Sequence, residues 1–180
     1  MPLTDQPDEV LDLVDDQDRV IGTVTREEVG RTLLALPGYV RAADAFIVND
    51  RGELFVPRRS SHKKLAPGGL DFSAGEHVGA GETYVQAMVR GFEEELGLRI
   101  TAADLIHIGT LDLKKLGLIP YFDAIFIYRT NEVPDYNKDD FVSHEWLPVA
   151  ELLQRLRAGE SAKVNMSPAL ELFLQTNKLG

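Results

Sequence analysis

Residues 75–98 read GEHVGAGETYVQAMVRGFEEELGL, and no other segment of the chain carries as many structural signals. Thr83 and Gln86 have the spacing of a capping box, in which each side chain accepts a hydrogen bond from the other residue's backbone N–H, so the pattern predicts that a helix begins here. Gly97 is typical of the residue that ends a helix. The segment therefore predicts a Gly-rich loop followed by an amphipathic helix. Its apolar residues repeat at helical spacing: Tyr84, Val85, Met88, Phe92 and Leu96.

Two neighbouring carboxylates gather late in this helix. Positions 91, 94 and 95 are spaced i, i+3 and i+4 and share one face, so Glu94 and Glu95 point away from Met88 and Phe92. Proteins commonly hold Mg²⁺ or Mn²⁺ with one or two carboxylates plus substrate phosphates. A run of glutamates near a helix end is more often a solvated face, so composition alone leaves both interpretations open.

The spacing within the segment resembles the Nudix box, which reads Gly, any five residues, Glu, any seven residues, Arg-Glu-aliphatic-any-Glu-Glu-any-Gly-aliphatic. A match of this length is far more specific than a lone glycine motif. The resemblance implies a catalytic set in which Glu94 and Glu95 hold Mg²⁺ or Mn²⁺, while Arg90 and Glu82 brace the box. The matching residues, all in register, are Glu82, Arg90, Phe92, Glu94, Glu95, Gly97 and Leu98.

Two positions depart from the Nudix pattern. Glu76 stands at the position of the first Gly of the box, with Gly75 one residue earlier. Gly91 stands where many Nudix hydrolases have a Glu that is a metal ligand or the base of the reaction. Gly91 removes one carboxylate and costs about 1 kcal/mol in a helix interior. The neighbouring Glu93 is rotated about 100° from the shared face. We therefore expect Glu76, or an acid from a later loop, to complete the metal ligands; otherwise metal affinity and turnover are reduced.

The resemblance extends to the Nudix branch that includes isopentenyl diphosphate isomerases, and it covers about residues 10–155. The isomerases place a nucleophilic Cys at the position of Gly75, and this chain contains no Cys, so isomerase chemistry by that route is excluded. His77 matches a metal ligand of the isomerases, but hydrolase relatives vary there, and a structural or exposed histidine is the simpler interpretation. The resemblance is carried by residues 56–60, 65–71 and 74–78, an N-terminal hairpin and the segment 140–147.

The remaining pattern predicts an α+β fold. Residues 1–8 form a polar tail, and residues 9–180 form a single domain with the box at about 75–98. Strands and helices mix without strict alternation, so the expected architecture is an α/β/α sandwich around a mixed sheet with a short N-terminal hairpin, as the Nudix resemblance also implies. The expected elements are a hairpin of 11–14 and 19–24, a helix from 25 to before Pro37, strands at 42–48, 53–56, 105–111, 121–128 and 145–147, and helices at 150–156 and 167–176.

Composition limits the chemistry. Of the 180 residues, 44% are hydrophobic and 27% charged, which excludes wholesale disorder. Without Cys, disulfides, thiolate metal sites and Cys nucleophiles are excluded. The net charge of −10 repels nucleic acid and anionic membranes, and no apolar run approaches the roughly 18 residues that span a bilayer. With no signal-peptide pattern, we expect a cytoplasmic protein that acts on a small molecule. Since Nudix relatives often dimerise, a homodimer is a further expectation.

A basic loop contrasts with this acidic composition. Residues 58–64, RRSSHKK, carry four formal positive charges in a chain of net charge −10. Because Arg binds phosphate oxygens with two parallel N–H groups, Arg58 or Arg59 is expected to contact a substrate phosphate. A solvated surface loop is the alternative interpretation.

Asp139 and Asp140 are acids of a later loop. The Nudix family often draws one metal ligand or base from the loop before its last sheet strand, so either residue could complete the site. A solvated turn is the simpler interpretation of both.

The sequence supports two functional hypotheses. The first is a Mg²⁺- or Mn²⁺-dependent Nudix hydrolase, a pyrophosphohydrolase that cleaves the diphosphate linkage of a nucleoside di- or triphosphate or a nucleoside diphosphate derivative. Its metal ligands would be Glu94, Glu95 and Glu76. The second, motivated by Gly91, is a catalytically weakened Nudix-fold module that binds a nucleotide or has a regulatory role.

Overall fold

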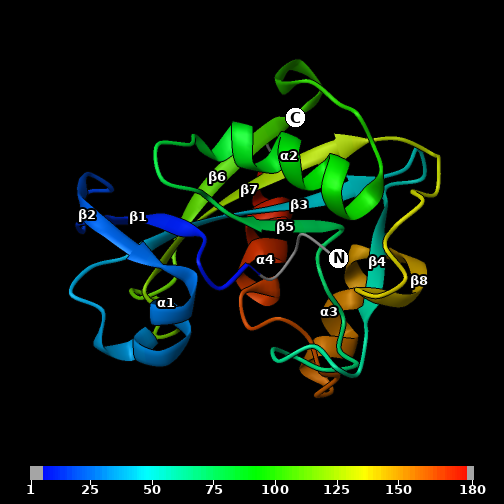
Figure 1. The fold of residues 1–180 in the computed structure, drawn as a ribbon. Helices are drawn as coiled ribbons and strands as arrows, with labels where there is room; N and C mark the ends of the chain where they lie inside the picture. The colour runs from blue at the N-terminus through cyan, green and yellow to red at the C-terminus, as the bar shows by residue number, and fades with distance from the viewer. Residues whose placement is uncertain (1–5, 178–180) are drawn as a thin grey trace.

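A mixed sheet forms the centre of the protein (Figure 1). The computed structural model describes residues 6–177. Within them the sheet consists of β3 (Val40–Val48), β4 (Glu53–Arg59), β5 (Ala74–His77), β6 (Ile106–Asp112), β7 (Tyr121–Arg129) and β8 (Phe141–Pro148). The strand order is β6-β7-β3-β4-β8, and β5 pairs with β3. β3 and β7 run parallel, while the other pairs are antiparallel, so the sheet is mixed as expected.

Helices cover both faces of the sheet (Figure 1). They are α1 (Arg26–Thr32), α2 (Tyr84–Leu96), α3 (Val149–Arg157) and α4 (Met166–Asn177). Successive residues of β3 point to opposite faces, so Ala45 packs with Phe92 of α2 while Phe46 packs with Leu170 of α4. The result is a core on each side of the sheet, which confirms the predicted α/β/α sandwich.

The N-terminal hairpin is also present. β1 (Val10–Val14) and β2 (Val20–Thr25) pair antiparallel, and α1 follows directly. Thr25 caps α1 through a capping box with Glu28, where the sequence predicts that the helix begins. These three elements form a small unit at one end of the sheet (Figure 1).

The N-terminal unit docks on the Gly-rich loop that precedes α2. The backbone N–H of Ala80 donates to the carbonyl of Val10 over 2.9 Å, and the N–H of Gly81 donates to Asp12 Oδ2 over 3.0 Å. Asp12 is buried, whereas Gly81 is exposed, so this hydrogen bond is partly buried. The hairpin is therefore held directly beside the box.

α2 forms where the sequence predicts it. Gln86 N–H donates to Thr83 Oγ1 over 3.2 Å and Thr83 N–H donates to Gln86 Oε1 over 2.9 Å, which completes the capping box. Gly97 ends the helix at φ 63°, a conformation that favours glycine. The apolar side of α2 is buried on the sheet, Glu93 is exposed, and Glu94 and Glu95 are partly buried.

The strand β5 is the main difference from the sequence-based expectation. The sequence reads as part of a Gly-rich loop there, because Gly75, Glu76 and His77 have low strand propensity. Pairing with β3 makes the segment a strand, with Asp44 opposite Gly75. β8 is also longer than the expected 145–147, since it begins at Phe141 to pair with the whole of β4.

Across residues 6–177, the structure has no helix that combines the length and apolar character needed to cross a membrane.

Candidate active site

The two unusual residues of the box lie against each other. A Cβ built on Gly91 would stand 2.4 Å from Cγ of Glu76, closer than two carbon atoms can approach. β5 thus aims the Glu76 side chain into the space that a side chain at position 91 would fill. The Glu76 side chain in this position therefore leaves no room for a side chain at position 91.

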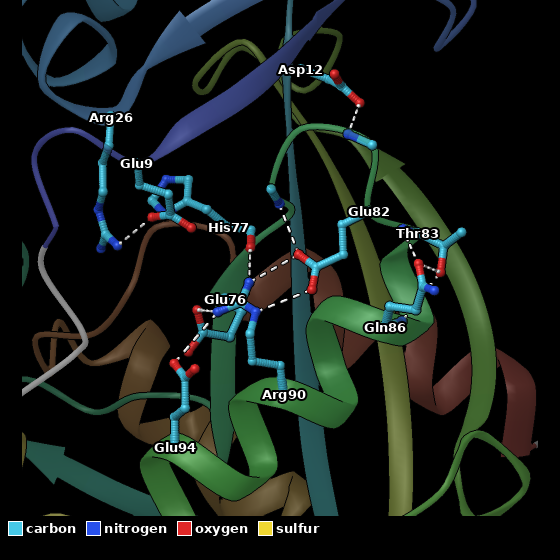
Figure 2. Close-up of polar contacts among 12 residues, drawn as sticks. Glu9, Asp12, Arg26, Glu76, His77, Glu82, Thr83, Gln86, Arg90 and Glu94 are labelled. Carbon is cyan, nitrogen blue, oxygen red and sulfur yellow. Dashed lines mark hydrogen bonds and ion pairs between the residues drawn. The ribbon is translucent and has the colours of Figure 1, made fainter.

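Arg90 links the acids of the site (Figure 2). Its guanidinium donates to Glu82 through two nitrogens, at 3.1 and 3.0 Å, and to Glu76 Oε2 at 3.1 Å. The same group reaches Glu94 Oε2 at 3.5 Å and the carbonyl of His77 at 2.9 Å. The hydrogen bond with Glu82 is the main reason that the pKa of Arg90 is raised, so the arginine stays charged among these acids.

Glu82 also fixes the loop in front of α2. Its Oε2 accepts a hydrogen bond from the backbone N–H of Gly79 over 2.9 Å. Glu82 and Arg90 therefore brace the loop-helix junction, in the geometry that the sequence suggested.

Burial makes the carboxylates of the site difficult to ionise. The side chain of Glu76 is 7% exposed, and its burial raises the pKa to about 7 although Arg90 favours the charged form. Glu95 accepts a hydrogen bond from Gly75 N–H over 3.0 Å, yet burial raises its pKa well above the usual range, and Glu76 adds to the effect. Like charges held close in a partly dry site favour binding of a cation.

The donor chemistry fits a hard divalent cation. Glu76, Glu94 and Glu95 offer carboxylate oxygens, the ligands that Mg²⁺ and Mn²⁺ prefer. Among residues 6–177, however, no three His, Asp or Glu side chains already stand as a metal-ligand set. Glu76 and Glu94 both contact Arg90, so binding a metal requires these two side chains to turn from the arginine.

A cleft of about 240 Å³ opens over Glu76 and Glu94, while Glu95 lies outside the described residues that line it. One side belongs to the box region and the other to the N-terminal segment, where Arg26 Nη1 pairs with Glu9 Oε2 at 3.1 Å. Figure 2 shows these two residues across from Glu76, Arg90 and Glu94. The cleft is lined by Gln6, Glu9, Arg26, Glu76, Gly79, Glu82, Arg90 and Glu94.

Sequence reasoning did not identify Glu9 and Arg26 as site residues. They lie about 50 residues or more before the box, and no local pattern marks them. The docking of β1 on the Gly-rich loop brings them to the cleft, and that contact depends on the folded structure.

Comparison with known protein families places the box residues within a known domain. The family model described as NUDIX domain matches residues 38–170. The chain belongs to the Nudix family. An uncharacterized Nudix hydrolase from Nostoc is 38% identical over 165 residues, which cover 92% of this chain and 95% of the relative. The crystal structure of a Deinococcus radiodurans protein has a TM-score of 0.79 and 36% identity, covering 91% and 98% of the two chains.

A more distant relative carries the name of the isomerase branch. An isopentenyl-diphosphate Delta-isomerase from Pectobacterium atrosepticum is 29% identical over 158 residues, covering 87% of this chain and 83% of the relative. In this Nudix protein, a Cβ at Gly75 would lie 2.2 Å from Asp44 Oδ1 and 2.9 Å from Lys163 Nζ. Any side chain there, including a nucleophilic Cys, would displace both groups. The packing therefore agrees with the exclusion of isomerase chemistry.

The basic loop of this Nudix protein is engaged in ion pairs. Arg59 is buried and pairs with Asp71, while Arg58 pairs with Glu160 at 2.6 Å. Both arginines lie outside the set of described residues that line the cleft. The expected contact of Arg58 or Arg59 with a substrate phosphate stays a prediction, and it would require these pairs to open.

The simpler interpretation of the sequence places Asp140 in a solvated turn, but the structure buries this residue. It is 3% exposed and pairs with Lys63 of the basic loop. Asp139 remains exposed. The buried pair ties the loop 58–64 to the start of β8, a contact between distant segments that the turn-like composition did not reveal.

The imidazole of His77 is partly buried beside Tyr121, which is typical of a histidine with a structural role. Its Nε2 lies 3.0 Å from the hydroxyl of Tyr121, and burial lowers the pKa of the imidazole to about 3. The ring is therefore neutral at ordinary pH, and the backbone carbonyl of His77 accepts a hydrogen bond from Arg90 (Figure 2).

Proposed function

We propose that this Nudix protein is a divalent-metal-dependent hydrolase that cleaves the diphosphate linkage of a nucleoside di- or triphosphate, or of a nucleoside diphosphate derivative. The main support is the contact between Glu76 and Gly91, because it returns a third carboxylate to the neighbourhood of Glu94 and Glu95. Glu76 would then make up for the carboxylate that is missing at Gly91, so that three acids remain available to the metal.

Glu76, Glu94 and Glu95 would hold the metal. When bound, Mg²⁺ or Mn²⁺ supplies a Lewis acid that polarises a phosphoryl oxygen and lowers the pKa of a water molecule. The protein's own contribution is to position these carboxylates: Arg90 contacts Glu76 and Glu94, and Glu82 fixes Arg90. A permanently charged arginine at this place also attracts the phosphate oxygens of a substrate.

The size of the cleft supports a diphosphate as the reacting group. Its volume of about 240 Å³ lies below the roughly 300–1,000 Å³ of sites that enclose a whole small molecule. The cleft therefore suits the phosphate chain, while the nucleoside would extend past its edge.

The second hypothesis, a weakened binding or regulatory module, rests on a different observation. Glu76 and Glu94 are held by Arg90 rather than arranged as a ready ligand set among the described residues. If that arrangement persists with metal present, the protein would bind nucleotides without cleaving them.

Release of phosphate or pyrophosphate from a nucleotide panel, with Mg²⁺ or Mn²⁺, tests the proposal. Glu95→Gln and Glu76→Gln should each lower kcat by about 100-fold or more, because each removes a charge that stabilises the metal-bound transition state. Glu93→Gln is the matched control, since Glu93 is 58% exposed and pairs only on the surface with Arg99. Normal rates in the first two variants, or no turnover by the wild type across the panel, would refute the proposal.

A further inference from the structure

The wall of the cleft opposite α2 comes from outside the matched family domain. That domain begins at residue 38, whereas Glu9 and Arg26 belong to the N-terminal segment and to α1. The backbone N–H of Arg26 donates to the carbonyl of Glu9 over 2.9 Å, so the two residues are held together by main chain as well as by side chain. The N-terminal unit thus adds a fixed polar surface to the Nudix site.

The two arginines of the cleft have different surroundings. Arg90 donates to Glu82, Glu76 and a backbone carbonyl, so its hydrogen-bonding capacity is largely used in holding the box. Arg26 pairs with Glu9 at the cleft margin, where their side chains are 24% and 21% exposed. This pair is partly buried, so a phosphate that takes the place of Glu9 must supply a charge-assisted contact of comparable strength.

The charge of Arg26 acts across the cleft. Burial raises the pKa of Glu76, and after the larger effects of Arg90 and Glu94 the positive charge of Arg26 lowers it; the same charge disfavours the charged form of His77, after burial. Arg26 is therefore within electrostatic reach of the carboxylate set on the other wall. An anion that bridges the cleft would meet this guanidinium at its outer end.

We propose that Arg26 binds the phosphate group of the substrate that lies farther from Glu94 and Glu95, exchanging its pairing with Glu9 for a phosphate oxygen. The inference rests on the proposed function and assigns the N-terminal unit a role in recognising a diphosphate. A guanidinium binds phosphate through two parallel N–H groups. A substrate with a neutral group in place of the outer phosphate would not pair with the charge of these N–H groups. Glu9 competes with the phosphate and keeps Arg26 directed toward the cleft.

Binding of methylenediphosphonate, a diphosphate that cannot be hydrolysed, tests the inference by calorimetry in the presence of Mn²⁺. Arg26→Met should weaken this binding by about tenfold or more, the value of one charge-assisted hydrogen bond. Arg26→Lys should recover part of the loss. Arg31→Met is the matched control on the same helix, because Arg31 is 66% exposed and its nearest acid, Glu27, stands 3.9 Å away.

Three further measurements make the result decisive. Mn²⁺ affinity, measured by electron paramagnetic resonance, should be the same in Arg26→Met and the wild type. With a hydrolysed nucleotide, the variant should raise KM by about tenfold while kcat changes little, as expected for lost ground-state binding. Glu9→Gln, which removes the competitor, should bind methylenediphosphonate several-fold more tightly.

Unchanged methylenediphosphonate affinity in a folded Arg26→Met variant would overturn the inference alone, as would weaker binding by Glu9→Gln. A wild-type protein that binds neither Mn²⁺ nor methylenediphosphonate would refute the proposed function, and this inference with it.

Discussion

At the scale of single residues, the exchange between positions 76 and 91 defines this Nudix protein. The Glu76 side chain can occupy its place beside α2 because Gly91 has no side chain. The helix gives up about 1 kcal/mol of intrinsic propensity at Gly91. Under the proposed function, the carboxylate that the box lacks on α2 would come from Glu76 on β5.

A double-mutant cycle tests this reciprocity. Gly91→Glu should bring two side chains into one space, lowering stability by about 1–3 kcal/mol and disturbing the site. Glu76→Gly should lower kcat/KM by about 100-fold, because a carboxylate is lost. The double variant restores the usual box and should recover most of the activity. Steady-state kinetics and thermal unfolding of the four proteins measure the coupling, and additive losses in the double variant would contradict it.

At the scale of the elements, the site was predictable where local signals act alone. α2 was predicted because its capping box, apolar spacing and Gly97 all lie within one segment. Arg90, Glu94 and Glu95 follow from that helix, since its geometry sets their relative positions, whereas Glu82 precedes the cap and is held by Arg90 and Gly79. The sequence predicts Glu76, or an acid from a later loop, as the substitute for the lost acid, but it does not predict the strand that carries Glu76.

The sequence does not predict β5, and the reason is physical. A four-residue strand rich in Gly and charged residues has little intrinsic preference for the extended state, and its hydrogen bonds to β3 supply the stability. The same reasoning applies to Arg26 and Glu9, whose approach to the cleft depends on β1 binding the Gly-rich loop. Contacts between distant segments carry no local signature.

The cap of α2 provides a test at this scale. Thr83→Ala should lower the free energy of unfolding by about 1 kcal/mol, because the side chain that satisfies the N–H of Gln86 is removed. Urea unfolding should show a lower midpoint with an unchanged m-value. Thr101→Ala is the control: Thr101 has the same capping box, but it caps only the short turn Ala102–Asp104, so its loss should be smaller. An equal or larger loss in the control would contradict the prediction.

At the scale of the whole molecule, the cleft is an assembly of distant parts. The matched domain, residues 38–170, supplies the acids and Arg90, while the N-terminal unit supplies Glu9 and Arg26. The fold itself was predictable from the mixture of elements and the box. The complete cleft was not, because one of its walls lies outside the segment that carries the motif.

The central claim is that Glu76, Glu94 and Glu95 together hold a divalent metal beside the diphosphate site. An anomalous difference map from crystals soaked in Mn²⁺ examines it most directly. We predict a manganese peak in the cleft, coordinated by carboxylate oxygens of all three residues. A cleft without a peak, or a manganese ion bound with Glu76 still turned toward Arg90, would contradict the claim.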